Sequence, residues 1–414
     1  MKYFATLAIL LATTSLASAA SNESFILQVG KHNSGTVSQK NGNNGQATAQ
    51  FGKNNSATTT QKSTGASNES GTLEIGNKNV STVGQTGGNN VQGTLQIGDK
   101  NQALTLQGND SSALNRSGTA QFGNGNNSVA AQDGGGNTQG TLQFGAGKNS
   151  GNLAETAQTN GVNGDKNNST TIQGGAENTA ITAQNSAGAS GTNPGVGGLN
   201  NQLSVQFGFG NSAKTDQNSF GSGDKKQAVS GVENQSATLQ FGAGNTASTT
   251  QSGAVLGKKG NKAENDSLTT QFGAGNTSTV KQTNGNNAQG TLQFGADNTA
   301  KTTQKNIDNG SGANASLTLQ GGFGNTATTR QKIADPLNGG LNGSLIAQVG
   351  KNNTALAHQN DTGLQPMIGA NLQATVQVGN GNTATTVQTA SVGVTNASVT
   401  AQFGSHNTAV TTQH

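Results

Sequence analysis

The most regularly spaced residues in this chain of 414 residues carry side-chain amides. One frame occurs fifteen times: Asn, five residues, Gln, one apolar residue, Gly, two residues, Asn, five residues, Gln. Amides donate and accept hydrogen bonds, but they do not serve as acids, bases or nucleophiles. The spacing therefore predicts hydrogen bonding between copies. A repeat of about 22 residues indicates a solenoid, a propeller or an array.

The frame positions are the candidate site residues. The leading Asn and the Gly occur in all fifteen copies, and Glu74 replaces the first Gln once. In the sixth copy an extra residue is expected to bring Asn149 and Glu155 to the second-half positions. The first, second, ninth and fifteenth copies comprise Asn22, Gln28, Gly30, Asn33, Gln39; Asn44, Gln50, Gly52, Asn55, Gln61; Asn234, Gln240, Gly242, Asn245, Gln251; and Asn396, Gln402, Gly404, Asn407, Gln413.

Other chemistry has little support in the sequence. The four histidines, His32, His358, His406 and His414, are scattered, and there is no cysteine. No set of Ser, His and Asp and no pair of carboxylates recurs at a useful spacing. We therefore expect no enzyme, no metal site and no cofactor.

The composition argues against an ordinary globular core. Apolar residues make up 29% of the chain, whereas roughly 45–50% is usual. Disorder normally combines low hydrophobicity with high net charge, yet only 10% of residues are charged and the net charge is +4. Low charge lets similar segments stack without repulsion, and it gives no sign of a nucleic-acid partner.

Each half of the frame is a seven-residue segment rich in Thr, Val, Leu and Ala, and four residues with a Gly separate the halves. This pattern predicts strand, tight turn, strand. Alternation places Asn and Gln on one face with small residues such as Ala247, whereas Lys214, Asp216 and Arg330 fall on the other. We expect the charged face to be solvated and the amide face to lie inside.

Turn lengths favour an all-β, single β-solenoid of about fifteen strand-turn-strand repeats over residues 20–414, stacked in parallel as cross-β structure. The inner turn holds four residues in fourteen copies, whereas the joining stretch varies from 4 residues to 16. In solenoids, insertions collect in loops on one face. The long inserts Asn185–Leu199, Ser252–Glu264 and Asn360–Ala370 are expected to be surface loops.

Stacking at about 4.7–4.9 Å would place each amide over its copy and form Asn and Gln ladders along the stack. An unsatisfied buried amide costs about 1–3 kcal/mol, so such ladders would enforce the register. The alternative is that these amides are solvated turn residues. Solvated turns would not require fixed spacing within both strands.

The outer face of the first half has two interpretations. Leu and Phe residues recur there and would form an apolar stripe suited to association. Alternatively, the inward face of this strand is reversed and these residues are the core. The positions concerned include Leu142, Phe144, Leu239, Phe241, Leu292 and Phe294.

The first nineteen residues have the features of a secretory signal peptide. Lys2 is followed by an apolar stretch over residues 4–12 and by the small-residue site Ala17-Ser18-Ala19. We expect residues 1–19 to be removed and the mature protein to be exported. No later segment is apolar for the 18 or so residues that a membrane-spanning helix needs.

The frame Asn44, Gln50, Gly52, Asn55, Ala57, Gln61 resembles the curlin repeat, with Asn in place of the usual leading Ser. Curlin is the major subunit of curli, the functional amyloid of bacterial biofilm matrix. The resemblance spans nearly the whole mature chain. It implies a secreted subunit that forms extracellular cross-β fibres on the cell surface, with itself and a curli-type secretion and nucleation system as partners.

The first frame follows the expected cleavage site and the last ends at Gln413, so we expect uncapped rungs that allow head-to-tail addition. A second hypothesis is an ice-binding solenoid, because outward positions such as Thr246 and Thr383 often carry Thr. Lys281 and Arg330 interrupt that face. A third hypothesis, a monomeric repeat adhesin, would need a binding head outside the frame.

Overall fold

A computed structural model describes residues 22–109, 113–145, 151–161, 166–187, 198–222, 232–256, 263–306, 312–334, 340–362, 369–391 and 393–414. The expected signal peptide, Asn149 and most of the three long inserts lie outside these ranges. The chain divides into two compact units, Met1–Asn185 with Gln206–Phe209 and Ser186–Val205 with Gly210–His414. Each unit is described by itself.

The first unit contains two parallel sheets. One comprises β1 (Asn22–Lys31), β3 (Asn44–Lys53), β5 (Asn68–Asn77), β7 (Asn90–Asp99), β9 (Asn115–Asn124), β11 (Asn137–Gly145) and β13 (Lys166–Ala176), in that order. The other comprises β2 (Ser34–Lys40), β4 (Ser56–Lys62), β6 (Val80–Gly87), β8 (Gln102–Asn109), β10 (Asn127–Asp133), β12 (Leu153–Asn160) and β14 (Thr179–Ala187).

The second unit is built in the same way. Its first sheet comprises β15 (Leu199–Phe209), β17 (Val232–Ala243), β19 (Ala263–Ala274), β21 (Asn287–Ala296), β23 (Ala313–Phe323), β25 (Leu341–Lys351), β27 (Ala370–Asn380) and β29 (Thr395–Ser405). Its second comprises β16 (Ser212–Ser222), β18 (Thr246–Leu256), β20 (Thr277–Thr283), β22 (Thr299–Asn306), β24 (Thr326–Ile333), β26 (Thr354–Asp361), β28 (Thr383–Ala390) and β30 (Thr408–Gln413).

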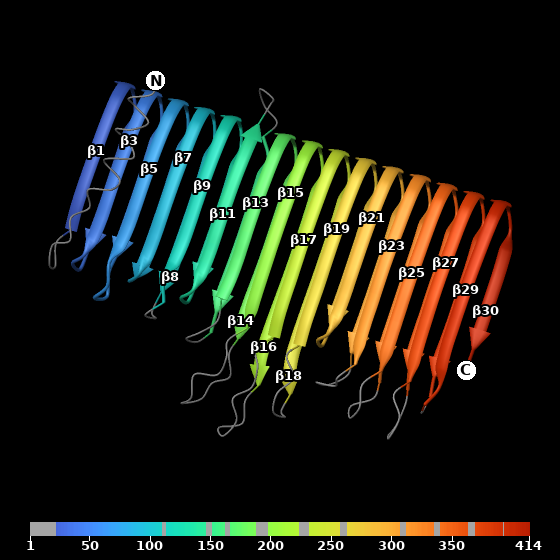
Figure 1. The fold of residues 1–414 in the computed structure, drawn as a ribbon. Helices are drawn as coiled ribbons and strands as arrows, with labels where there is room; N and C mark the ends of the chain where they lie inside the picture. The colour runs from blue at the N-terminus through green and yellow to red at the C-terminus, as the bar shows by residue number, and fades with distance from the viewer. Residues whose placement is uncertain are drawn as a thin grey trace, which may run out of the picture. The chain divides into compact units, whose positions relative to one another are not determined.

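Within each unit, every copy of the frame forms one rung, with its first strand in one sheet and its second strand in the other (Figure 1). Successive rungs pair in parallel with identical frame positions opposite each other, as in Asn44 with Asn68 and Gly52 with Gly76. The predicted all-β, parallel β-solenoid is confirmed. The described residues include no helix, and hence none able to span a membrane.

Glycine makes the inner turn possible. Gly98 has φ of 124°, and a Cβ on it would lie 2.0 Å from the carbonyl oxygen of Gly123 in the next rung. The residue directly before the second-half Asn is also left-handed, as Lys100 with φ of 59° and Gly244 with φ of 62° show. Only glycine avoids both the strain and the clash at the frame position, which explains its presence in every copy.

The interior is mainly polar. Gln50 and Asn245 are fully buried, while most buried apolar residues are alanines, such as Ala247 at 2% exposure. Phe144, at an outward position, is 43% exposed. The prediction that Asn and Gln face inward is therefore confirmed in both strands, and the reversed interpretation of the first strand is wrong.

The prediction for the sixth copy is wrong. β12 pairs with β10 so that Gln158 lies opposite Gln132, and Glu155 is exposed opposite Val129. Asn152 donates to Asn126 Oδ1 at 3.2 Å, so the second half uses Asn152 and Gln158. The inner turn of the sixth copy is therefore longer than in the other copies. Its second strand must stay in register with the neighbouring strands to keep both ladders intact, and a turn can contain additional residues.

Candidate functional site: the amide ladders and the end faces

The Asn ladders run along both sheets of each unit. In the second unit, Asn265 Nδ2 donates to Asn234 Oδ1 at 2.8 Å, and Asn276 Nδ2 donates to Asn245 Oδ1 at 3.1 Å. Second-strand Asn residues also bond the backbone of the following rung, as Asn245 Nδ2 does with the carbonyl of Gly273 at 3.0 Å. Each of these side chains thus ties its own rung to both neighbours.

The Gln ladders have the opposite direction. Gln251 Nε2 donates to Gln282 Oε1 of the following rung at 2.8 Å, and Gln240 does the same to Gln271 at 2.8 Å. Within the Asn ladders, Nδ2 donates to the Oδ1 of the preceding rung. Each rung is therefore chemically different on its two faces.

Backbone partners fix these directions independently of how the amides are assigned. The backbone N–H of Asn276 donates to Asn245 Oδ1 at 3.1 Å, so that atom must be the oxygen. Gln251 Nε2 lies 2.7 Å from each of the carbonyl oxygens of Gln235 and Asn265, so it must be the nitrogen. A carbonyl can only accept and a backbone N–H can only donate, and the ladders are therefore polar.

The structure brings every predicted frame residue of the four named copies to the same positions in a rung. Those in the second and ninth copies are buried apart from the turn glycines, and those in the first copy are more exposed. The interior members are Asn44, Gln50, Asn55, Gln61, Asn234, Gln240, Asn245 and Gln251; the members in terminal rungs are Asn22, Gln28, Asn33, Gln39, Asn396, Gln402, Asn407 and Gln413; the turn glycines are Gly30, Gly52, Gly242 and Gly404.

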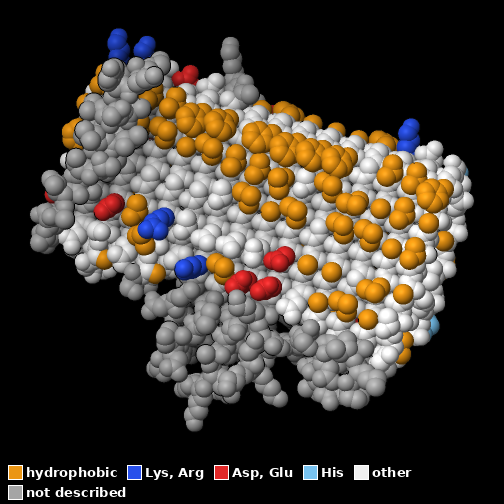
Figure 2. Space-filling model, in the orientation of Figure 1, with side chains coloured by type: hydrophobic (Ala, Val, Ile, Leu, Met, Phe, Trp, Pro, Cys, Tyr) orange, Lys and Arg blue, Asp and Glu red, His pale blue; other side chains and the backbone are white. Residues whose placement is uncertain are grey.

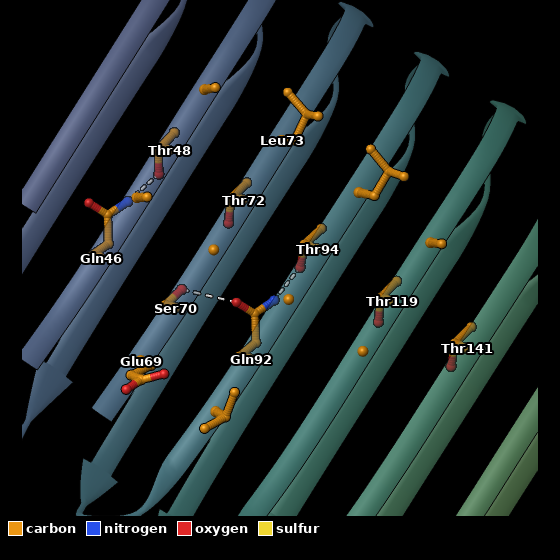
Figure 3. A pocket seen from close by; sticks show the side chains of 18 of the residues that line it. Gln46, Thr48, Glu69, Ser70, Thr72, Leu73, Gln92, Thr94, Thr119 and Thr141 are labelled. Atoms are coloured by element: carbon orange, nitrogen blue, oxygen red, sulfur yellow. Dashed lines mark hydrogen bonds between the residues drawn. The ribbon is translucent and has the colours of Figure 1, made fainter. Parts of the chain in front are cut away.

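A further polar network was missed from the sequence. Ser70 Oγ donates to Gln92 Oε1 at 2.9 Å, and Gln92 Nε2 donates to Thr94 Oγ1 (Figure 3). Where the following rung carries Ser instead of Gln, as after Ser236, the hydroxyl has no partner. Alternation of Ser and Gln at the third strand position in successive copies was the available signal.

One frame position carries a carboxyl. Glu74 on β5 is fully buried, and Gln50 Nε2 donates to its Oε2 at 2.7 Å. Burial raises the pKa of Glu74 to about 8, while hydrogen bonds from Gln50 and the Ser81 backbone lower it by less. The group is therefore mainly neutral at pH 7 in the folded chain.

The predicted apolar stripe lies on the outer face of the first sheet. In the second unit the rings of Phe241, Phe272 and Phe294 stack at centroid distances of 5.1 and 5.0 Å. In the first unit Phe122 and Phe144 stack at 5.3 Å. Figure 2 shows apolar side chains gathered in rows on this face, and Gly174 and Gly321 interrupt the column of Phe residues.

A shallow groove in the first unit follows a column of glycines, with Leu73 and Leu95 beside it (Figure 3). Its lining residues include Gly71, Gly93 and Gly118. The lining has Ser and Thr hydroxyls but no histidine or lysine to activate them. In the described parts of the chain, no cluster of His, Asp or Glu is arranged to hold a metal ion. His32 and His406, with φ of 56° and 57°, serve as left-handed turn residues.

The terminal strands expose the inside of the solenoid. β1 and β2 each have one hydrogen-bonded neighbour among the described strands, and so do β29 and β30. Ile26 occupies an inward position yet is 40% exposed, whereas its register partner Thr48 is 2% exposed. Among the described residues, therefore, no strand covers the outer face of either outermost rung.

The hydrogen-bonding groups on these faces are complementary. Within the described residues, Oε1 of Gln28 and of Gln39 receives no hydrogen bond. In the next rung, Oε1 of Gln50 accepts from Gln28, and Oε1 of Gln61 accepts from Gln39. At the other end, Gln402 and Gln413 donate only to backbone carbonyls, at 3.0 and 2.9 Å. One face thus offers Gln oxygens where the other offers Gln amide hydrogens.

No protein-family model matches this chain, and no curated protein does either. The fold and the chemistry of the end faces are therefore the basis for any functional conclusion, and the resemblance to curlin stays a prediction.

Proposed function

We propose that this protein is a secreted structural subunit that assembles head to tail into extracellular cross-β fibres. The observation that carries the proposal is the polarity of the ladders together with the uncovered faces of the terminal rungs. Gln413 Nε2 lacks the Gln oxygen that Gln388 Nε2 finds at 2.7 Å, and Gln39 Oε1 lacks a corresponding donor. A second copy docked as the next rung would supply both.

The polarity also selects the mode of docking. Two faces that both present Gln oxygens leave acceptors opposite acceptors, which costs about 1–3 kcal/mol for each buried unpaired group. Head-to-tail docking pairs every ladder. Because this contact is heterologous and does not close on itself, its product is a filament.

The resemblance of the frame to the curlin repeat supports the same function from the sequence. It extends the proposal to export through the expected signal peptide, to fibres on the bacterial surface, and to a curli-type secretion and nucleation system. Low net charge favours close packing of copies, because like-charge repulsion along the stack is small.

A chain terminator tests the docking mode. In interior rungs the first N–H of the second strand donates to the next rung, as Thr383 N does to the carbonyl of Asn407 at 2.8 Å. Thr408 is the equivalent residue of the last rung, so Thr408→Pro removes a donor at the uncovered edge. Thr411→Lys adds a charge that a docked copy would bury, since Thr386 at this position is fully buried.

We expect the Thr408→Pro, Thr411→Lys variant to fold, to join the end of a growing fibre, and to stop growth. Added to wild type at a small fixed proportion, it should shorten fibres in electron micrographs out of proportion to its amount. Co-assembly without shortening would refute head-to-tail rung addition and favour lateral association through the Phe stripe.

The matched interior control is Thr246→Pro with Thr249→Lys. Thr246 N donates to the carbonyl of Asn276 at 2.8 Å and Thr249 is 1% exposed, so the same changes there break existing contacts. This variant should fold poorly and leave wild-type fibre length unchanged. The comparison separates blocked growth from general damage.

An ice-binding function has one observation in its favour. Seven consecutive rungs of the second unit carry Thr in register at one outward position: Thr246, Thr277, Thr299, Thr326, Thr354, Thr383 and Thr408. Lys281, Lys301 and Arg330 interrupt the neighbouring columns, so these Thr residues form a single regular column. Inhibition of ice recrystallisation by the monomer would favour this function, and its absence would count against it.

A further inference from the structure

Glu74 interrupts a Gln ladder with a buried carboxyl group. Its register neighbours are Gln50 on β3 and Gln96 on β7, and all three side chains are fully buried. Gln50 Nε2 donates to Glu74 Oε2 at 2.7 Å, so the contact with the preceding rung is made. The contact with the following rung differs, because a carboxyl has no amide nitrogen.

Two oxygens are left without donors at this point. Glu74 Oε1 and Gln96 Oε1 are both buried, and neither has a hydrogen-bond partner. Gln96 cannot reverse its amide to help, because its Nε2 already donates to the carbonyl of Val80 at 3.1 Å and to Gln121 Oε1 at 2.8 Å. Only a hydrogen on Glu74 Oε1 would satisfy both oxygens at once.

We propose that Glu74 is protonated in the folded chain and donates its O–H to Gln96 Oε1, so that the side-chain ladder between β5 and β7 is continuous with the proton and interrupted without it. This contact between two rungs thereby depends on a proton. Protonation takes a hydrogen ion from solvent, and deprotonation returns it. The inference concerns the folded monomer and goes beyond the proposed assembly.

Among the described residues, no charged side chain lies on the inward faces of the strands around Glu74. Those faces carry Gln46, Thr48 and Gln50 on β3, Gln92, Thr94 and Gln96 on β7, Ala57, Thr59 and Gln61 on β4, and Ser81, Val83 and Gln85 on β6. None of these titrates. Glu69 on the same strand is exposed on the opposite face. An ionised Glu74 would therefore be a buried, unpaired charge, which is strongly unfavourable.

The sign of the pH dependence follows from linkage. The pKa of Glu74 is raised by burial from 4.5 to about 8 in the folded chain. The folded state therefore holds the proton more tightly, and the stabilisation is complete below about pH 4.5 and lost as the pH rises through 8. Across these roughly 3.5 pH units the ratio of folded to unfolded β5–β7 should fall by up to about three-thousandfold.

The test compares the full chain with Glu74→Gln, which restores the amide, and with Glu69→Gln, an exposed control on β5. Backbone hydrogen exchange at β5 and β7, in denaturant, is followed between pH 5 and 9 and corrected for intrinsic exchange rates. Wild type and Glu69→Gln should lose protection with rising pH, whereas Glu74→Gln should not. Equal pH dependence in all three proteins would overturn the proposal.

A second measurement detects the proton directly. The infrared C=O stretch of a neutral carboxylic acid should be present in wild type and Glu69→Gln at pH 7, and absent from Glu74→Gln. Its absence from wild type at pH 7 would overturn the proposal even if stability varies with pH. Gln121→Glu, at the same position two rungs later, should add a second neutral-acid band.

Discussion

Replacing one interior ladder residue, Gln282 on β20, should measure how much a rung depends on its amides. Its Oε1 accepts from Gln251 at 2.8 Å, and its Nε2 donates to Gln304 Oε1 at 2.9 Å and to the carbonyls of Asp266 and Asn287 at 2.7 and 3.0 Å. The Nε2 group has two hydrogens, which the three acceptors share, so with the bond at Oε1 the side chain makes about three full hydrogen bonds. Gln282→Leu removes them from a fully buried site while keeping a similar volume.

Three hydrogen bonds sum to roughly 1.5–4.5 kcal/mol at about 0.5–1.5 kcal/mol each. Leucine regains about 1.5–3 kcal/mol through apolar burial, but the oxygen of Gln304 loses its donor, at a cost of about 1–3 kcal/mol. The gain from burial and the cost at Gln304 nearly cancel, so we expect a net loss of about 3 kcal/mol in local stability.

The assay must be local, because solenoid stability is a sum over neighbouring repeats and global unfolding need not be two-state. Hydrogen exchange of β20 and β22 amides reports the opening of this rung. Thr279→Leu, at an exposed position of β20, is the matched control and should change protection by less than about 0.5 kcal/mol. A loss below about 1 kcal/mol for Gln282→Leu would show that packing, rather than the ladder, holds the rung.

Three further pairs of measurements test the remaining contacts. By denaturant unfolding, Gly98→Ala should lower the free energy of unfolding by several kcal/mol, because φ is 124° and the new Cβ would lie 2.0 Å from a carbonyl oxygen. Gly93→Ala on the same strand should leave the free energy of unfolding unchanged or raise it. Ser267→Ala should lower the free energy of unfolding by about 1 kcal/mol, because it removes the 3.0 Å hydrogen bond from Ser267 Oγ to Gln289 Oε1 of the next rung. Ser236→Ala should leave that free energy unchanged, because the Ser236 hydroxyl has no hydrogen-bond partner. Asp266→Asn should stabilise the chain at pH 7 but not under strongly acidic conditions, because burial and two neighbouring carboxylates raise the pKa of Asp266; equal gains at both pH values would contradict this.

The fixed spacing of Asn, Gln and Gly was sufficient to predict the solenoid, its inward face and its ladders. Strand alternation has a period of two, so a frame conserved at fixed spacing in fifteen copies determines which face each side chain occupies. The outward stripe of Phe241 and Phe294 followed from the same alternation, because a residue next to a buried Gln in a strand points to the opposite face.

What could not be predicted depends on contacts between rungs. The spacing of the sixth copy predicted Asn149 and Glu155 for its second half, whereas pairing with β10 selects Asn152 and Gln158. The directions of the donors also depend on backbone atoms of the following copy, such as the carbonyl of Asn265 and the N–H of Asn276. The sequence shows Glu74 only as a single replacement of Gln, and its consequence arises from its register partner Gln96 in the following copy.

The ladders also bear on why docking would be specific rather than a general tendency to aggregate. A copy displaced by one residue along the strand would bring outward residues such as Lys281 and Thr279 over buried positions and would leave every amide of the contact unpaired. A copy docked in register makes, by the proposal, the same contacts that join any two rungs within a unit. Growth would then require no surface beyond the repeat itself, and its arrest by a change confined to the last rung would follow from the same hydrogen bonds that hold the interior.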